Sequence, residues 1–130
     1  MRYIADTNIL VAVAMNEPEK PWLVEVTKDC QLMAPTVLPF EIGNALSALV
    51  KRKILQVDQV SNAWDSLVRI PVELVEFDVR AGLLLAARNG IYAYDGYYLQ
   101  CAIESSCPLL TLDQRMKQIA VNIGIEVVEQ

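Results

Sequence analysis

Residues 1–15 have the sequence MRYIADTNILVAVAM, and the secondary structure predicted for this stretch decides the fold class. The apolar run Tyr3–Ala5 stops at Asp6, and a second apolar run begins after Asn8. This order is typical of a short buried strand followed directly by a buried helix, with Thr7 or Asn8 near the helix N-cap. A carboxylate therefore stands between two segments that both belong in a core.

The same alternation of short apolar runs and longer helical segments continues to the end of the chain. We expect strands at residues 2–5, 31–34, 72–77, 108–112 and 125–129, and helices at 8–15, 17–30, 36–53, 57–70, 78–90, 93–106 and 113–124. Pro21 fits the first turn of its helix, Asp58 a helix cap, and Asn89-Gly90 a helix end. Strands that alternate with helices predict an α/β domain over residues 1–130, with a central, mostly parallel sheet of about five short strands flanked by helices.

Composition narrows the classes of function. The chain has 130 residues, 54% of them hydrophobic, a net charge of −5 and no histidine. Without histidine there is no Ser-His or Cys-His nucleophile pair, and a zinc site is disfavoured. Cys30, Cys101 and Cys107 lack the Cys-x-x-Cys spacing, so we interpret Cys101 and Cys107 as core residues. No apolar run is long enough for a membrane span and no signal-peptide pattern precedes the first helix, so we expect a soluble cytoplasmic protein.

Two aspartates follow predicted strands directly. Asp6 comes after the first strand and Asp113 after the apolar run 108–112. Ligands of parallel sheets bind beyond the carboxyl ends of the strands, so both residues would share a binding edge if the strands are neighbours. The alternative is that each aspartate simply caps the helix behind it.

Two further acids lie on helix faces that should point inward. Glu41 is followed at helical spacing by Ala45 and Ala48, and Asp95 by apolar residues at the same spacings. A buried carboxylate without a partner is costly, and no Lys or Arg lies one turn from either residue. Oxygen ligands suit Mg²⁺ or Mn²⁺, so we predict one or two such ions among Asp6, Glu41, Asp95 and Asp113.

The acidic net charge does not exclude nucleic acid. Outside the proposed site, twelve acids face eleven Lys and Arg residues, which leaves a charge of only −1. Candidate phosphate contacts are Lys51, Arg52, Lys53, Arg88, Arg115 and Lys117. The residues at 51–53 are also a normal solvated helix end, which we favour for that run, whereas Arg115 stands two residues beyond Asp113 and can reach the same crevice.

Four motifs in order carry a resemblance: ADTNIL (5–10), FEIGNAL (40–46), YDGYYLQCA (94–102) and LLTLDQRM (109–116). Together they resemble a PIN-domain ribonuclease of the VapC toxin type, over nearly the whole chain. The resemblance implies that Asp6, Glu41, Asp95 and Asp113 bind magnesium or manganese and that the protein cleaves RNA. It also implies accessory polar roles for Asn8 and Thr111, a cognate antitoxin as partner, and a homodimer.

The chain departs from the family pattern at two places. Gly96 stands where alanine is usual after the third acid, and Leu112 and Gln114 flank the last acid where basic or polar residues are common. The first is a change between small residues, and the second bears on substrate preference rather than on the metal site.

Two other classes of function remain open from the residues. One is a catalytically silent PIN-like scaffold that binds a protein or RNA, which the high apolar content favours. The other is a phosphoacceptor receiver domain or an Asp-x-Asp phosphatase. The receiver needs paired acids at the first strand, and the phosphatase needs an aspartate at Asn8, so both fit poorly.

Overall fold

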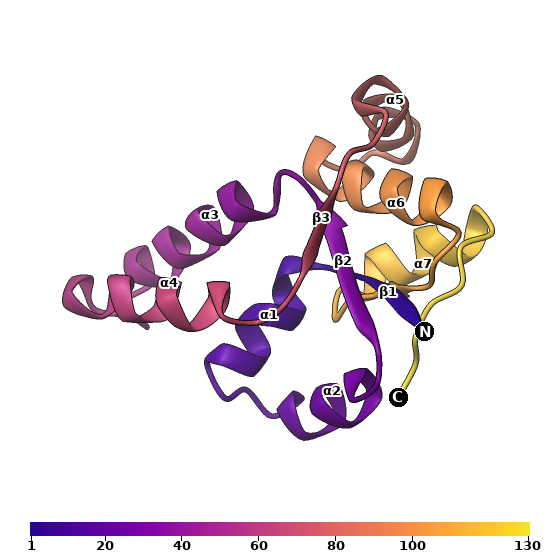
Figure 1. Ribbon diagram of the computed structural model, residues 1–130. Helices are drawn as coiled ribbons and strands as arrows, with labels where there is room; N and C mark the ends of the chain where they lie inside the picture. The colour runs from indigo at the N-terminus through magenta and orange to yellow at the C-terminus, as the bar shows by residue number, and fades with distance from the viewer.

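The computed structural model describes all of residues 1–130, with four strands flanked by seven α-helices (Figure 1). In chain order the elements are β1 (Arg2–Ala5), α1 (Thr7–Ala14), α2 (Lys20–Thr27), β2 (Gln31–Pro35), α3 (Leu38–Lys51), the 3₁₀ helix η1 (Val57–Gln59), α4 (Val60–Val68), β3 (Glu73–Val75), α5 (Val79–Asn89), α6 (Ala93–Ser105), β4 (Leu109–Leu110) and α7 (Gln114–Asn122). The predicted fold class, a single α/β domain around a parallel sheet, is confirmed.

The sheet is fully parallel, with strand order β3-β2-β1-β4. β1 is therefore central, and its last residue Ala5 lies opposite Leu110, the last residue of β4. The backbone amide of Asp6 still donates to the Leu110 carbonyl, at 3.0 Å. The two strands that precede Asp6 and Asp113 are thus neighbours and end together.

Alternation along the strands divides the core between the two faces of the sheet. Ile4 and Leu109 belong to the larger cluster of buried residues, with side chains from α3, α6 and α7. Tyr3 and Leu110 belong to the smaller cluster, with residues of α1 and α2. This is the period-two pattern of a sheet buried on both faces. It explains why the strands read as continuous apolar runs in the sequence.

The predicted fifth strand at 125–129 is the main difference in the fold. Only one bridge forms there, between Val127 and Leu109. β4 itself has two residues, and both Gly124 (φ 87°) and the exposed residues after Val128 lie outside the ladder. The C-terminal segment makes only two backbone hydrogen bonds with β4, which join Leu109 to Glu126 and to Val128.

The helix ends differ from the predictions in two places. The N-cap of α1 is Asp6, whose side chain accepts from the Thr7 amide, so Thr7 and Asn8 lie next to the cap and are not the cap itself. Asp58 caps nothing; Gln56 and Gln59 form a capping box around η1 instead. The end of α5 is as predicted, with Gly90 left-handed at φ 65°.

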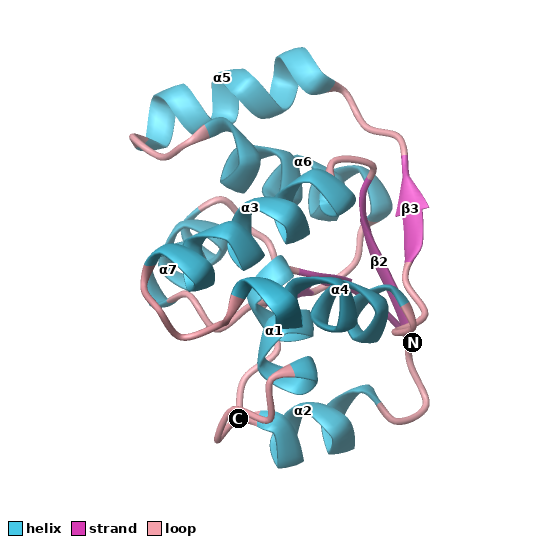
Figure 2. Cartoon of the chain, turned by 90° about the vertical axis from the view of Figure 1, so that its left-hand side faces the viewer, coloured by secondary structure: helices cyan, strands magenta, loops and turns pink.

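Helices α5 and α6 are held together by a contact between glycines. α5 lies along α6 at the end of the molecule opposite α2 (Figures 1 and 2). A Cβ added at Gly96 of α6 would meet the backbone carbonyl of Gly82 and, at 2.7 Å, the Cβ of Ala86. Only a residue without a side chain allows the two backbones to approach this closely.

We expect Gly96→Ala to lower the free energy of unfolding by about 1–3 kcal/mol, because it overpacks this helix contact. The matched control is Gly43→Ala in α3, where an added Cβ meets nothing within 4 Å. Alanine there should be neutral or stabilising by up to about 1 kcal/mol, since it is the better helix former. Urea unfolding of the two variants measures both. Equal stabilities would contradict the packing argument.

Candidate active site

The four acids predicted from the sequence come together in one cleft. A cavity of about 400 Å³ opens beyond the carboxyl ends of β1 and β4. Its lining includes all four predicted carboxylates, a fifth acid that the sequence analysis did not single out (Glu17), neutral polar groups and one cation: Asp6, Glu41, Asp95, Asp113, Glu17, Thr7, Asn8, Asn44 and Arg52. Residues separated by more than a hundred positions therefore share one surface.

Each of the four acids stands at the start of a helix. Asp6 is the N-cap of α1 and Asp113 the N-cap of α7. Glu41 lies in the first turn of α3 and Asp95 in the first turn of α6. The partial positive charge of a helix N-terminus stabilises a nearby anion. The capping role that was the alternative reading for Asp6 and Asp113 is thus real, and it coexists with their place in the cleft.

Asp6 is the most buried of these carboxylates, with 6% of its surface exposed. Its Oδ1 accepts from the Thr7 amide at 2.8 Å, and its Oδ2 accepts from the Thr111 hydroxyl at 2.8 Å and from Asn8 Nδ2 at 3.3 Å. Both oxygens are therefore fixed in direction by protein donors. The predicted accessory residues Asn8 and Thr111 both bind the first acid.

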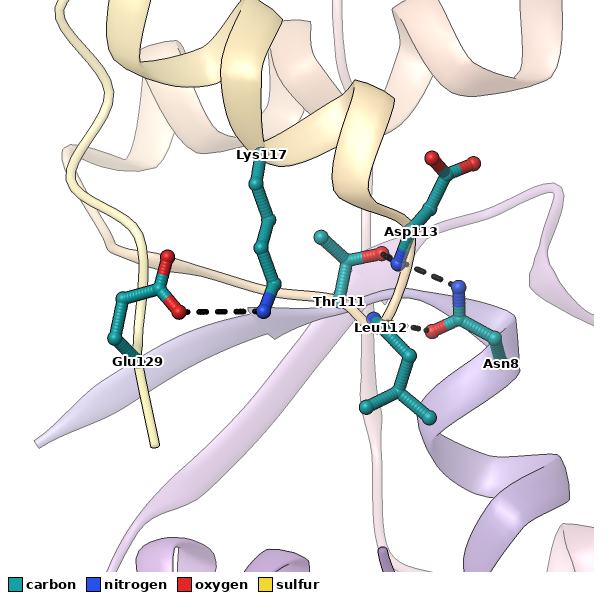
Figure 3. Close-up of polar contacts among 6 residues, drawn as sticks. All are labelled: Asn8, Thr111, Leu112, Asp113, Lys117 and Glu129. Carbon is teal, nitrogen blue, oxygen red and sulfur yellow. Dashed lines mark hydrogen bonds and ion pairs between the residues drawn. The ribbon is translucent and has the colours of Figure 1, made fainter.

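A second set of hydrogen bonds links β4 to α1 (Figure 3). Asn8 donates to the Thr111 hydroxyl (3.2 Å) and accepts from the Leu112 amide (3.1 Å), while the Asp113 amide donates to Thr111 (3.1 Å). The carboxylate of Asp113 points away from this network. Its Oδ1 accepts from the amides of Arg115 and Met116, and its Oδ2 has no hydrogen-bond partner.

Thr7 and Tyr98 are functional-site residues that the sequence reading missed. The Thr7 hydroxyl donates to Glu41 Oε2 at 2.6 Å and lies 2.8 Å from the Tyr98 hydroxyl, which must then be the donor to Thr7. Tyr98 is fully buried. Its position one helical turn after Asp95 was the available signal, because that spacing puts both side chains on one face of α6.

Burial and mutual repulsion make the acids reluctant to ionise. Desolvation, opposed by the Thr111 hydrogen bond and reinforced by Glu41 and Asp95, raises the pKa of Asp6 to about 7. Burial also raises the pKa of Glu41, with Asp95 adding to the effect. The pKa of Asp95 is raised by burial and by Asp113, and Arg115 partly offsets this. The cleft therefore lacks the cationic ion-pair partners that would favour the ionised form of these acids.

The donor set fits a hard divalent cation in chemistry. All four groups are carboxylates, and the one ion pair in the structure, Lys117 with Glu129, involves none of them (Figure 3). In the present side-chain conformations, no three acids form a ready set of metal ligands. Ligation would need small rotations, for which the unbonded Oδ2 of Asp113 and the partly exposed Glu41 and Asp95 leave room.

The candidate phosphate contacts are distributed unevenly. Arg115 borders a second cavity beside the acids, as expected from its position after Asp113. Arg52 lines the acidic cavity itself. Lys51, Lys53 and Arg88 border neither cavity, and Lys117 is engaged by Glu129.

These features define the class of protein: an α/β domain with an acidic cleft at the carboxyl ends of adjacent parallel strands. The chain belongs to the PIN domain family, whose model matches residues 3–122. Comparison with curated proteins gives no significant match.

Two solved structures share the fold. PAE2754 from Pyrobaculum aerophilum matches with a TM-score of 0.68 and 20% identity, over 92% of this chain and 79% of that one. VapBC2 from Rickettsia felis, bound to a DNA fragment from its promoter, matches with a TM-score of 0.66 and 19% identity, over 99% and 98%. No helix of the present chain has both the length and the apolar character needed to cross a membrane.

Proposed function

We propose that the protein is a Mg²⁺- or Mn²⁺-dependent endoribonuclease that acts as the toxin of a toxin–antitoxin pair. The observation that carries the proposal is the gathering of Asp6, Glu41, Asp95 and Asp113 in one cleft without a cationic partner in ion-pair contact. Membership of the PIN family, whose domains are generally nucleases, supports the same reaction class. The fold shared with VapBC2 supports the assignment as a toxin.

The mechanism would follow from the roles of this chain's own residues. Asp6, Asp95, Asp113 and Glu41 would hold the cation, which supplies activation of the attacking water and charge stabilisation at the departing oxygen. Thr111 and Asn8 fix the direction of the Asp6 oxygens. Glu41 or Asp113 takes the proton of the attacking water. The new bond joins water oxygen to phosphorus, and the bond from phosphorus to the 3′ oxygen breaks.

The partners follow from the same proposal. A cognate antitoxin would cover the cleft, with a basic side chain placed among the acids, and the toxin would form a homodimer in the cytoplasm. Large apolar side chains such as Val24, Val57 and Leu83 are exposed and available for such contacts. Expression of the chain alone should arrest growth, and co-expression with its cognate antitoxin should restore it.

The reaction is tested directly with purified protein. Cleavage of total RNA should require Mg²⁺ or Mn²⁺ and stop with EDTA, and 5′-end mapping should give discrete internal sites. Single-stranded DNA of matched sequence serves as the comparison substrate. Cleavage that persists in EDTA would contradict the metal-dependent mechanism.

A catalytically silent scaffold is the second candidate, and one observation favours it. No three of the acids are arranged as metal ligands in their present conformations. A calorimetric titration with Mg²⁺ or Mn²⁺ separates the two functions: the nuclease must bind the ion, and the scaffold need not. RNA binding without ion binding or cleavage would favour the scaffold.

Thr111→Val should reduce cleavage about 10–100-fold, as loss of a group that orients a metal ligand commonly does. The hydroxyl is buried and bonds to both Asp6 and the Asp113 amide, so valine leaves both without this partner. Thr111→Ser keeps the hydroxyl and should restore most of the activity. Metal affinity should change in parallel with activity, and equal activity of the valine and serine variants would contradict the role.

A further inference from the structure

A second cavity of about 410 Å³ adjoins the acidic one. It is lined by Gly90, Ile91, Tyr92, Asp95, Asp113, Arg115 and Met116. Asp95 and Asp113 line both cavities, so whatever occupies the second is in contact with the edge of the proposed reaction centre. Its volume lies in the range of small-molecule sites and is sufficient for one nucleotide.

Tyr92 is the feature of this cavity that packing does not explain. With 87% of its surface exposed, it is the most exposed large hydrophobic side chain of the protein. The neighbouring aromatic rings pack among themselves, Tyr97 with both Phe77 and Tyr94, and leave Tyr92 without an aromatic partner. Its hydroxyl makes no hydrogen bond and its side chain does not cap α6. The ring thus offers a free face beside a nucleotide-sized space.

Arg115 places a positive charge in the same cavity. One guanidinium nitrogen donates to the Gly90 carbonyl at 3.0 Å, which holds the side chain against the loop that precedes Tyr92. It makes no ion pair with Asp95 or Asp113. The remaining guanidinium donors are free for a phosphate, which arginine binds with good geometry.

A second unpaired arginine, Arg52 at the end of α3, lines the acidic cavity itself. A polyanion that spans both cavities would meet Arg52 in one and Arg115 in the other. Such an arrangement fits a phosphate backbone whose central phosphate lies at the proposed cation site.

We propose that the second cavity is a nucleotide subsite for unpaired RNA next to the cleaved phosphate, in which Tyr92 stacks on the base and Arg115 binds the adjoining phosphate. This inference rests on the proposed function and adds to it two residues that bind the substrate beside the cleaved phosphate, Tyr92 and Arg115. An exposed ring can stack only on a base that has left its own helix, so duplex RNA is excluded from the subsite. Stacking tolerates every base, so the subsite selects single strands rather than a sequence.

The test is oligonucleotide binding, measured by fluorescence anisotropy with the full chain carrying Asp6→Asn, so that the RNA is not cut. The probe is a labelled ten-nucleotide RNA without secondary structure, with a hairpin of the same composition for comparison. Adding Tyr92→Ala should weaken binding of the single strand about 5- to 150-fold, and Tyr92→Phe should not. Phe40→Ala, which removes another exposed ring away from both cavities, is the matched control.

An abasic scan locates the stacked base. An RNA that lacks the base at the stacked position should bind the Asp6→Asn parent more weakly than the complete RNA does. The same RNA should bind the Tyr92→Ala variant about as well as the complete RNA does, since the missing base and the missing ring remove the same contact. Arg115→Ala should reduce the slope of log affinity against log salt by about 1, and Arg115→Lys should retain it.

The outcomes separate this inference from the proposed function. If otherwise wild-type protein cleaves RNA and Tyr92→Ala binds within twofold of its parent, the inference is overturned and the nuclease stands. If the chain neither binds nor cleaves RNA, both fall. If Tyr92→Ala leaves RNA binding intact but prevents self-association or antitoxin binding, Tyr92 belongs to a protein interface and the subsite is overturned.

Discussion

Asp6→Asn should lower Mg²⁺-dependent RNA cleavage by about 10³-fold or more while the protein stays folded, since it removes a charge on which transition-state stabilisation depends. Asp6 is the central member of the cleft, bonded to Thr7, Asn8 and Thr111. Asparagine has the same shape but binds a divalent cation far more weakly than a carboxylate does. Asp95→Asn should have an effect of similar size, because Asp95 lies between the two cavities.

The control for these variants is Asp29→Asn. Asp29 is exposed and lies outside every cavity of the site, so the net charge changes equally while the cleft does not. Initial rates on a single-stranded RNA, with near-ultraviolet circular dichroism to verify the fold, give the comparison. Full activity in both Asp6→Asn and Asp95→Asn would end the proposal that these acids carry the chemistry.

Asp6→Asn should also raise the free energy of unfolding of the metal-free protein at neutral pH. Because the folded-state pKa of Asp6 is raised to about 7, the folded chain keeps a proton that the unfolded chain releases at about pH 4. The contribution of Asp6 to the free energy of unfolding is therefore greatest below about pH 4, falls as the pH rises to about 7, and is lost above that pH. At pH 8 the wild-type protein is less stable by up to about 4 kcal/mol than it would be with Asp6 protonated, and Asp6→Asn removes this loss.

The net gain expected for Asp6→Asn in EDTA at pH 8 is about 1–3 kcal/mol, since an amide nitrogen in place of Oδ2 cannot accept the bonds that Thr111 and Asn8 donate. Urea unfolding from pH 4 to 8 should show a downward slope for wild type and a shallower one for the variant. The remaining slope belongs to Glu41 and Asp95, whose pKa values are raised as well. Adding Mg²⁺ should reverse the order, because binding stabilises only the chain that holds the ion. A variant less stable than wild type at pH 8 in EDTA would contradict the assigned pKa.

Local pattern was sufficient to predict the order of elements and the edge at which the acids meet. The apolar runs around Ile4 and Leu109 were predicted as buried strands. One is followed directly by Asp6 and the other closely by Asp113, so the pairing of these two strands brings both aspartates to the same edge of the sheet. Glu41 and Asp95 could be identified because each is an acid on a helix face that is otherwise apolar. The row after Glu41 was only partly as expected: Ala48 is exposed, because it faces the cleft and not the core.

The features that the sequence did not reveal depend on contacts between distant segments. The bond of Thr7 with Tyr98 joins residues 91 positions apart, and nothing local to either predicts it. The short β4 limits how far the C-terminal segment can pair, and this depends on where the neighbouring strand ends. The need for glycine at position 96 appears only when α5 is placed against α6.

The position of Asp6, Glu41, Asp95 and Asp113 at helix starts bears on how such a protein loses its activity. Asparagine is as good a helix-initiating residue as aspartate, so a single-base codon change at Asp6 or Asp113 removes a negative charge and leaves the fold intact. Alanine at the same positions would damage the fold and the chemistry at once. Inactive copies that persist in genomes and still associate with partners should therefore carry asparagine at these sites more often than alanine.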